Sequence, residues 1–155
     1  MSEPAHILLV EDDKASRVTL TVCLEEEGDE VRPCETAKEA IDQIVSGIPT
    51  EVVISDLRLS DGSGLQILWA LKKINPDVTF ILITGHASVE TAIEAVNEGS
   101  FAYHVKPIDT DALIHSVRNA LEQHRLLVEN RELLQRAQRA NEELRTSLVE
   151  IEEKN

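Results

Sequence analysis

Short apolar runs in this chain end repeatedly at a polar residue, and the runs alternate with segments of helical periodicity. Asp12 follows HILLVE, Asp56 follows VVIS, Thr84 follows VTFILI and Lys106 follows FAYHV. In an alternating βα chain the carboxyl ends of the strands meet at one edge of a parallel sheet, which is where such sheets bind ligands. The sequence therefore predicts one polar site, built from four strand ends.

The apolar runs and the residues between them indicate an α/β fold. Strands are expected at residues 6–10, 29–33, 51–55, 78–83 and 101–105. Five helical segments alternate with them, and Gly or Pro residues punctuate the boundaries. In the first helix Ala15, Val18 and Val22 share the face expected to be buried, and in the third Trp69 is expected in the core. We predict a doubly wound, five-stranded parallel sheet with right-handed crossovers.

After Pro107 the chain contains no further Gly or Pro, which predicts one long helix from about residue 110 to 151. Two heptad series run through its second half, namely Leu127, Leu134, Asn141 and Leu148, and Asn130, Ala137, Leu144 and Ile151. Asn141 at an a position favours a parallel, in-register dimer. The alternative is a helix that packs back on its own domain. We expect a globular domain over residues 1–122 and a coiled-coil segment over residues 123–155.

The charge and the hydropathy of the chain argue against several classes of function. The net charge is −14, and residues 1–120 hold 9 Lys and Arg against 21 Asp and Glu. Such a surface disfavours direct binding to nucleic acid or anionic lipid, because both require clustered basic side chains. No apolar run approaches the length of a membrane span, and no signal peptide precedes the first strand. We therefore expect a cytoplasmic protein.

Carboxylates dominate the expected site. Residues 11–13 are three successive acids after the first strand, and Asp56 follows the third. Clustered carboxylates repel one another unless a cation compensates, and hard oxygen ligands suit Mg²⁺. Lys106 and Thr84 would each bind an oxygen of a phosphoryl group. Taken singly, these residues also fit ordinary roles as a helix cap, a turn former, a strand residue and a solvated charge.

Over about residues 4–122 the sequence closely resembles the receiver domain of two-component response regulators. The motifs LLVEDD, VVISDLRLSDGSG, ILITGHAS and AYHVKPI stand in the order and at the spacing of that family. The resemblance implies a flavodoxin-like (βα)5 fold. It also implies a signalling switch that is controlled by phosphorylation.

The resemblance assigns roles to the acidic residues. It makes Asp56 the phosphoacceptor, Asp12 a direct Mg²⁺ ligand and Glu11 a carboxylate that assists through water. It leaves open whether Asp13 takes that assisting role instead, because three acids run together. The backbone carbonyl of Arg58 would complete the protein's share of the metal shell.

Further roles follow from the same resemblance. Thr84 and Tyr103 correspond to the switch pair, and Lys106 corresponds to the phosphate-binding lysine. The bond before Pro107 is expected to be cis. Ser60 departs from the family, because many receivers have proline at this position.

The implied function is transfer of a phosphoryl group to Asp56 from a histidine kinase or phosphotransfer protein, with the domain catalysing only its own phosphorylation and dephosphorylation. The change would pass through the fifth helix and the coiled coil to an output domain after residue 155, or to a partner protein. A haloacid-dehalogenase-like phosphatase is a rival, but those enzymes need a second aspartate where this chain has Arg58. A coiled-coil dimerisation module that ignores phosphorylation is the other alternative.

Overall fold

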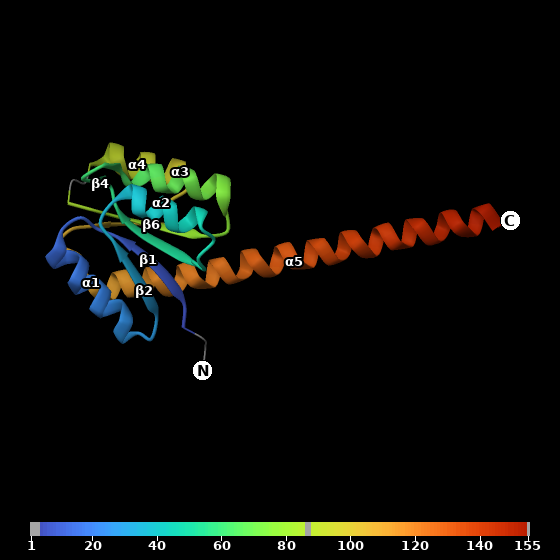
Figure 1. Ribbon diagram of the computed structural model, residues 1–155, viewed down its shortest axis with the longest axis horizontal. Helices are drawn as coiled ribbons and strands as arrows, with labels where there is room; N and C mark the ends of the chain where they lie inside the picture. The colour runs from blue at the N-terminus through green and yellow to red at the C-terminus, as the bar shows by residue number, and fades with distance from the viewer. Residues whose placement is uncertain (1–3, 86–87, 155) are drawn as a thin grey trace. The chain divides into compact units, whose positions relative to one another are not determined.

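A five-stranded parallel sheet organises the first part of the chain (Figure 1). The computed structural model describes residues 4–85 and 88–154, and within them the strands run in the order β2-β1-β3-β6-β7. They are β1 (His6–Val10), β2 (Glu30–Cys34), β3 (Val52–Asp56), β6 (Thr79–Thr84) and β7 (Ala102–Val105). Each lies within one residue of its expected limits. The predicted doubly wound parallel fold is confirmed.

Helices cover both faces of the sheet. The first turns of α5 (Thr110–Lys154) and α1 (Lys14–Glu26) lie on one face, and α2 (Ala37–Val45), α3 (Gly64–Ile74) and α4 (Val89–Glu98) lie on the other (Figure 1). Successive strand residues point to opposite faces, so Val53 packs under α2 and α3 while Ile54 packs under α1 and α5. This double burial explains why the strands read as continuous apolar runs.

Four predicted core positions are wrong, because Ala15, Val18, Val22 and Trp69 are all exposed. In α1 the buried side chains are Leu20 and Leu24, while Val18 and Val22 are 53% and 49% exposed. Two apolar spacings coexist in this helix, and the leucine face is the buried one because leucine removes more apolar area from water than valine. Trp69 is 43% exposed, and its indole N–H donates to the Glu98 carboxylate over 2.7 Å, which satisfies the polar end of the ring outside the core.

A short antiparallel hairpin separates β3 from α3 and was not foreseen from the sequence. It consists of β4 (Arg58–Leu59) and β5 (Gly62–Ser63). Helix α3 follows directly, because Ser63 caps it in a capping box with Gln66. A Cβ on Gly64 would lie 2.2 Å from the Asp56 carbonyl oxygen. The absence of a side chain at Gly64 therefore lets the chain pass directly against the end of β3.

Contacts divide the chain into two compact units, Met1–His124 and Arg125–Asn155. The helical prediction from residue 110 onward is confirmed, because α5 continues to Lys154. Several leucines and other large apolar residues of the second unit are more than half exposed: Leu126, Leu133, Leu134, Leu144, Leu148, Val149 and Ile151. Among the described residues, no helix combines the length and the hydropathy that a membrane span requires.

Candidate functional site

The sheet order brings the expected strand ends together at one edge. β1, β3, β6 and β7 are consecutive neighbours. Asp56 ends β3, Thr84 ends β6, and Lys106 directly follows β7, where its backbone N–H donates to the Thr84 carbonyl over 2.7 Å. Glu11 directly follows β1, and its N–H donates to the Cys34 carbonyl of β2 over 3.0 Å. Polar groups from four strand ends therefore line one edge.

Three carboxylates and one ammonium group form the centre of this edge. Oxygens of Glu11, Asp12 and Asp56 lie within 4.8 Å of one another. Glu11 is fully buried, Asp56 is buried and Asp12 is exposed. The Lys106 Nζ donates to Glu11 Oε1 over 2.7 Å and to Asp56 Oδ2 over 2.8 Å. One lysine therefore faces three acids.

The pKa values at this edge reflect the burial of the carboxylates and their excess over ammonium groups. Burial, reinforced by the neighbouring Asp56 carboxylate, raises the pKa of Glu11 to about 7 although its hydrogen bond with Lys106 opposes the rise. Burial lowers the pKa of Lys106, but its hydrogen bonds and charge interactions with Asp56 and Glu11 outweigh that effect and raise it above the ordinary value. The site favours additional positive charge.

The donor set fits a hard divalent cation. Within the part of the chain that the structure describes, the second carboxylate oxygen of Glu11, Oε2, is buried and has no hydrogen-bond partner. A buried carboxylate oxygen without a partner is costly, and a cation would compensate it. Carboxylate and carbonyl oxygens are the ligands that Mg²⁺ prefers. The residues present are therefore suited to this ion.

Two other candidate ligands have distinct surroundings. The N–H of Arg58 donates to Asp56 Oδ1 over 3.3 Å, so its backbone lies beside the acceptor. Asp13 instead caps α1, because its Oδ2 accepts from the Ser16 N–H over 2.9 Å. That hydrogen bond holds the pKa of Asp13 below its usual range. Asp13 lies outside the group of three carboxylates formed by Glu11, Asp12 and Asp56, and its carboxylate is engaged at the start of α1.

The expected switch pair lies on neighbouring strands and the same face of the sheet. Thr84 is fully buried. Tyr103 pairs with Leu82, two residues before Thr84, and packs against the core under α2 and α3. The Tyr103 hydroxyl lies 3.2 Å from Thr91 Oγ1 in the first turn of α4. A tyrosine beside Thr84 is thus linked directly to α4.

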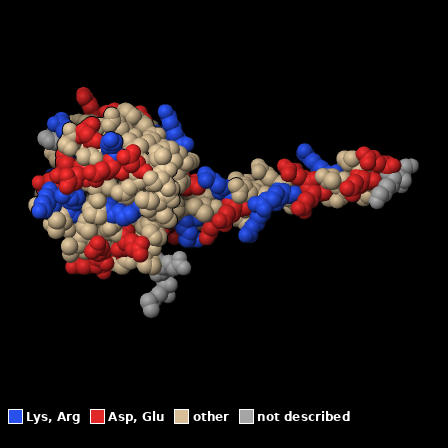
Figure 2. All heavy atoms as spheres, viewed as in Figure 1, with Lys and Arg blue, Asp and Glu red and all other residues tan. Residues whose placement is uncertain are grey.

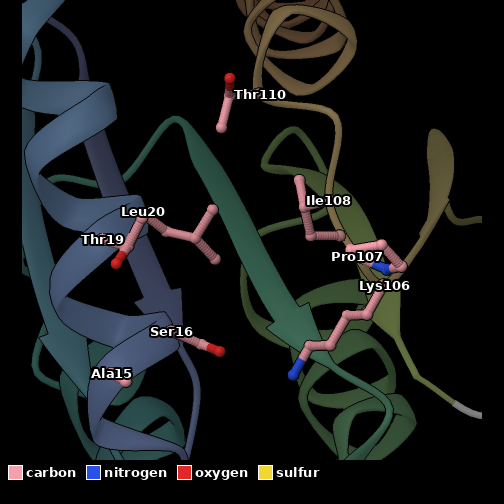
Figure 3. A pocket seen from close by; sticks show the side chains of 8 residues that line it. All are labelled: Ala15, Ser16, Thr19, Leu20, Lys106, Pro107, Ile108 and Thr110. Carbon is pink, nitrogen blue, oxygen red and sulfur yellow. The ribbon is translucent and has the colours of Figure 1, made fainter.

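A hollow of about 320 Å³ adjoins Lys106. It lies between α1, which contributes Ser16 and Leu20, and the loop after β7, which contributes Pro107 (Figure 3). The Lys106–Pro107 peptide bond is cis, as expected. The stick view shows the Lys106 side chain extending from this loop along one side of the hollow, so the hollow opens beside a residue of the site.

Sequence reasoning missed two residues that support this edge. Thr91 was read only as part of a helix, and Asp61 only as part of a turn. Asp61 Oδ1 and Oδ2 accept from the backbone N–H groups of Ala37 and Lys38, over 2.9 and 3.0 Å. These partners are 24 and 23 residues away in the chain, so no local spacing could have identified them.

The fold and the site together define the class of protein: a doubly wound α/β domain with a lysine-paired aspartate and an acidic cluster at the carboxyl edge of its sheet. The family model described as the response regulator receiver domain matches residues 7–118 of the sequence. The chain therefore belongs to the response regulator receiver family, whose domains are signalling switches of two-component systems.

Individual relatives agree with this assignment. The chain is 36% identical over 121 residues to the transcriptional regulatory protein GlrR of Escherichia coli K12, covering 78% of this chain and 27% of that protein. It is 33% identical over 147 residues to the C4-dicarboxylate transport transcriptional regulatory protein DctD of Rhizobium meliloti, covering 93% and 31%. The chain thus spans less than a third of these relatives.

Among solved structures, the fold is similar to that of the beryllofluoride-activated NtrC4 receiver domain dimer. The TM-score is 0.72 and the sequence identity is 29%, covering 77% of this chain and 98% of that one. The similarity extends over nearly the whole of a receiver domain.

Proposed function

We propose that Asp56 accepts a phosphoryl group from a histidine kinase or phosphotransfer protein. The observation that carries this proposal is the Asp56 carboxylate, buried at the sheet edge, held by Lys106 and lying beside Glu11. A carboxylate oxygen of Asp56 forms a bond to phosphorus while the phosphorus–nitrogen bond of the donor's phosphohistidine breaks. The imidazole nitrogen keeps the electron pair, and the product is an acyl phosphate on Asp56.

Lys106 balances charge during this transfer. Its Nζ, 2.8 Å from Asp56 Oδ2, is within reach of an oxygen on the incoming group and donates a charge-assisted hydrogen bond to it. The Thr84 hydroxyl donates to another phosphoryl oxygen. Positioning and electrostatics therefore supply most of the rate, as in other phosphoryl transfers.

The acidic cluster would hold Mg²⁺ through Asp12, Asp56 and the Arg58 carbonyl, with Glu11 assisting through water. Bound there, the ion would supply positive charge next to the phosphoryl oxygens. In the later hydrolysis a water oxygen forms a bond to phosphorus while the bond from phosphorus to the Asp56 oxygen breaks, which releases inorganic phosphate and returns the free carboxylate. The domain thus catalyses its own phosphorylation and dephosphorylation and no further turnover.

Phosphorylation shifts the domain between two packings. Thr84 moves toward the phosphoryl group, and Tyr103 turns into the space that it leaves. This turn would break the contact between the Tyr103 hydroxyl and Thr91, and so loosen the attachment of α4. The population shift draws its free energy from the new bonds to Thr84 and Lys106. It alters the surface formed by α4, β7 and α5.

The segment over residues 123–155 would pair with a second copy as a parallel coiled coil. Leu134 is 56% exposed, Leu144 is 59% exposed and Leu148 is 53% exposed, so the heptad positions are available for a partner helix. A buried pair of Asn141 side chains would fix the register. Residues 1–122 act as the receiver, and the pair relays its state to an output domain after residue 155 or to a partner protein.

Three expectations from the sequence remain predictions. They are a cytoplasmic location, the absence of direct binding to nucleic acid, and the absence of membrane association. Asp and Glu side chains cover much of the visible surface of the first unit, with fewer basic ones between them (Figure 2). This distribution supports the expectation about nucleic acid.

Incubation with Mg²⁺ and acetyl phosphate tests the chemistry and separates the alternatives. A receiver gains one acid-stable, base-labile phosphoryl group per chain, and Asp56→Asn abolishes it. A phosphatase of the haloacid-dehalogenase type would release many equivalents of phosphate instead. A coiled-coil module that ignores phosphorylation would gain no phosphoryl group, and either result would overturn the proposal.

Light scattering tests the pairing. We expect a dimer for the full chain and a monomer for Leu134→Glu, which places a charge in the seam. Gln135→Glu adds the same charge one position away, outside the two heptad series, and should leave the dimer intact. A monomeric wild-type chain, with and without beryllofluoride, would exclude the coiled coil.

A further inference from the structure

Asp61 joins the loop after the acceptor to a distant helix. It lies in the two-residue turn between β4 and β5, the hairpin that begins two residues after Asp56. Both oxygens of its carboxylate accept backbone hydrogen bonds from the first turn of α2, from Ala37 over 2.9 Å and from Lys38 over 3.0 Å. The contact spans two segments that no strand pairing connects.

The chemistry of the contact is that of a helix cap supplied from outside the helix. The first backbone N–H groups of a helix have no partner within it, and the N-terminus carries partial positive charge. The side chain of Thr36 accepts from the N–H of Glu39 over 3.1 Å, and Asp61 accepts from the two positions before it. These backbone hydrogen bonds lower the pKa of Asp61. The carboxylate is therefore ionised at neutral pH.

The hairpin that Asp61 holds is the one that carries Arg58. Arg58 pairs with Ser63 across the hairpin, and its N–H donates to the Asp56 carboxylate. The turn itself has little intrinsic rigidity, because Ser60 lacks the ring that fixes φ in proline, and Gly62 adopts a φ of 155°. Leu59 of β4 is buried in the same cluster as Ala37 and Ala40 of α2, and the Asp61 carboxylate supplies the hydrogen bonds that join the turn itself to that helix.

We propose that Asp61 is a positioning residue, which fastens the β4–β5 hairpin to α2 and thereby sets the affinity of the site for Mg²⁺ through the backbone of Arg58. The inference rests on the proposed function, because it takes the Arg58 carbonyl as a metal ligand. Among the described residues, the hydrogen-bond partners of the Asp61 carboxylate are Ala37 and Lys38 and not members of the acidic cluster, so its effect passes through the hairpin.

The test compares Asp61→Ala and Asp61→Asn with wild type. Asp42→Ala is the matched control, because it removes one negative charge from an exposed position on α2 itself. Without metal, amide hydrogen exchange followed by NMR at Ala37 and Lys38 should be about tenfold faster in Asp61→Ala. Calorimetric titration with Mg²⁺ should give a Kd about three- to tenfold weaker. For Asp61→Asn, both the exchange rates and the Kd should lie between those of wild type and Asp61→Ala, since the neutral amide is a weaker acceptor.

A positioning role also predicts how phosphorylation responds. At saturating Mg²⁺ the rate with acetyl phosphate should return to within about twofold of wild type, because Asp61 is remote from the reacting atoms. The inference is overturned if Asp61→Ala accelerates amide exchange but leaves Mg²⁺ affinity at the value of the Asp42→Ala control. It is equally overturned if amide exchange is unchanged. A wild-type chain that binds no Mg²⁺ would instead overturn the proposed function.

Discussion

Glu11 makes the stability of the metal-free protein fall as pH rises. Its pKa is about 7 in the folded state, against 4.5 for a free glutamate. Between these values the folded state retains a proton that the unfolded state has released, so deprotonation favours unfolding. The stability linked to Glu11 is therefore complete below about pH 4.5 and is lost as pH rises through 7.

The magnitude follows from the difference between the two pKa values. Each pH unit inside the window changes the free energy of unfolding by about 1.4 kcal/mol. Between pH 5 and pH 8 the contribution of Glu11 amounts to a loss on the order of 2 to 3 kcal/mol. Glu11→Gln keeps the size of the side chain and removes the titration. The difference in the free energy of unfolding between wild type and this variant should therefore change by that amount from pH 5 to pH 8.

Urea unfolding in EDTA, followed by the fluorescence of the single tryptophan, Trp69, measures this difference at pH 5, 6, 7 and 8. Titrating groups that do not contact Glu11, such as His104, whose pKa is lowered chiefly by burial, cancel between the two proteins. Adding Mg²⁺ at pH 8 should stabilise wild type and stabilise Glu11→Gln less, because this variant keeps Asp12 and Asp56 but loses the carboxylate that would assist through water. If the free energies of unfolding of the two proteins differ by the same amount, within about 0.5 kcal/mol, at all four pH values, then Glu11 does not have a raised pKa in the folded state.

Three further changes have defined outcomes. Gly64→Ala should lower the melting temperature by several degrees and slow phosphorylation, because its Cβ would meet the Asp56 carbonyl; thermal unfolding and acetyl phosphate labelling measure both. Tyr103→Phe removes the contact with Thr91 and should speed amide exchange in the first turn of α4, with a loss of stability of about 1 kcal/mol or less. Asn141→Leu should raise the thermal stability of the dimer and loosen its register, which cross-linking across the seam would detect.

The fold was predictable because its signals are local and repeated. Each strand is a run of buried residues, each helix has its own period, and turn residues separate them. The carboxyl-edge site follows from the alternation of strands and helices, because parallel strands place their carboxyl ends, and with them Asp56 and Lys106, at one edge of the sheet. Strand limits differed by single residues, as expected where frayed ends are assigned by hydrogen bonds.

The remaining features depend on contacts between distant segments. Val18 and Leu20 lie on two different apolar faces of α1, and the face that is buried is the one whose leucines pack against the sheet and α5. Trp69 was assigned to the core by its size, but Glu98 of α4 supplies a partner for its N–H at the surface. The capping of α2 by Asp61 joins residues more than twenty positions apart. Such pairings are set by tertiary packing, which one sequence does not encode locally.

The placement of functional residues at consecutive strand ends determines where the chain tolerates changes in length. A residue inserted within β3 would move Asp56 by about 3.3 Å and turn its side chain to the opposite face of the sheet. The loops at the other edge, residues 46–51 and 75–78, connect helices to strands far from the reacting groups. Insertions there cost little loop entropy and leave the registers of the strands intact. Fluorescent tags and evolutionary insertions are therefore best accommodated at the amino edge, while the carboxyl edge keeps a fixed length.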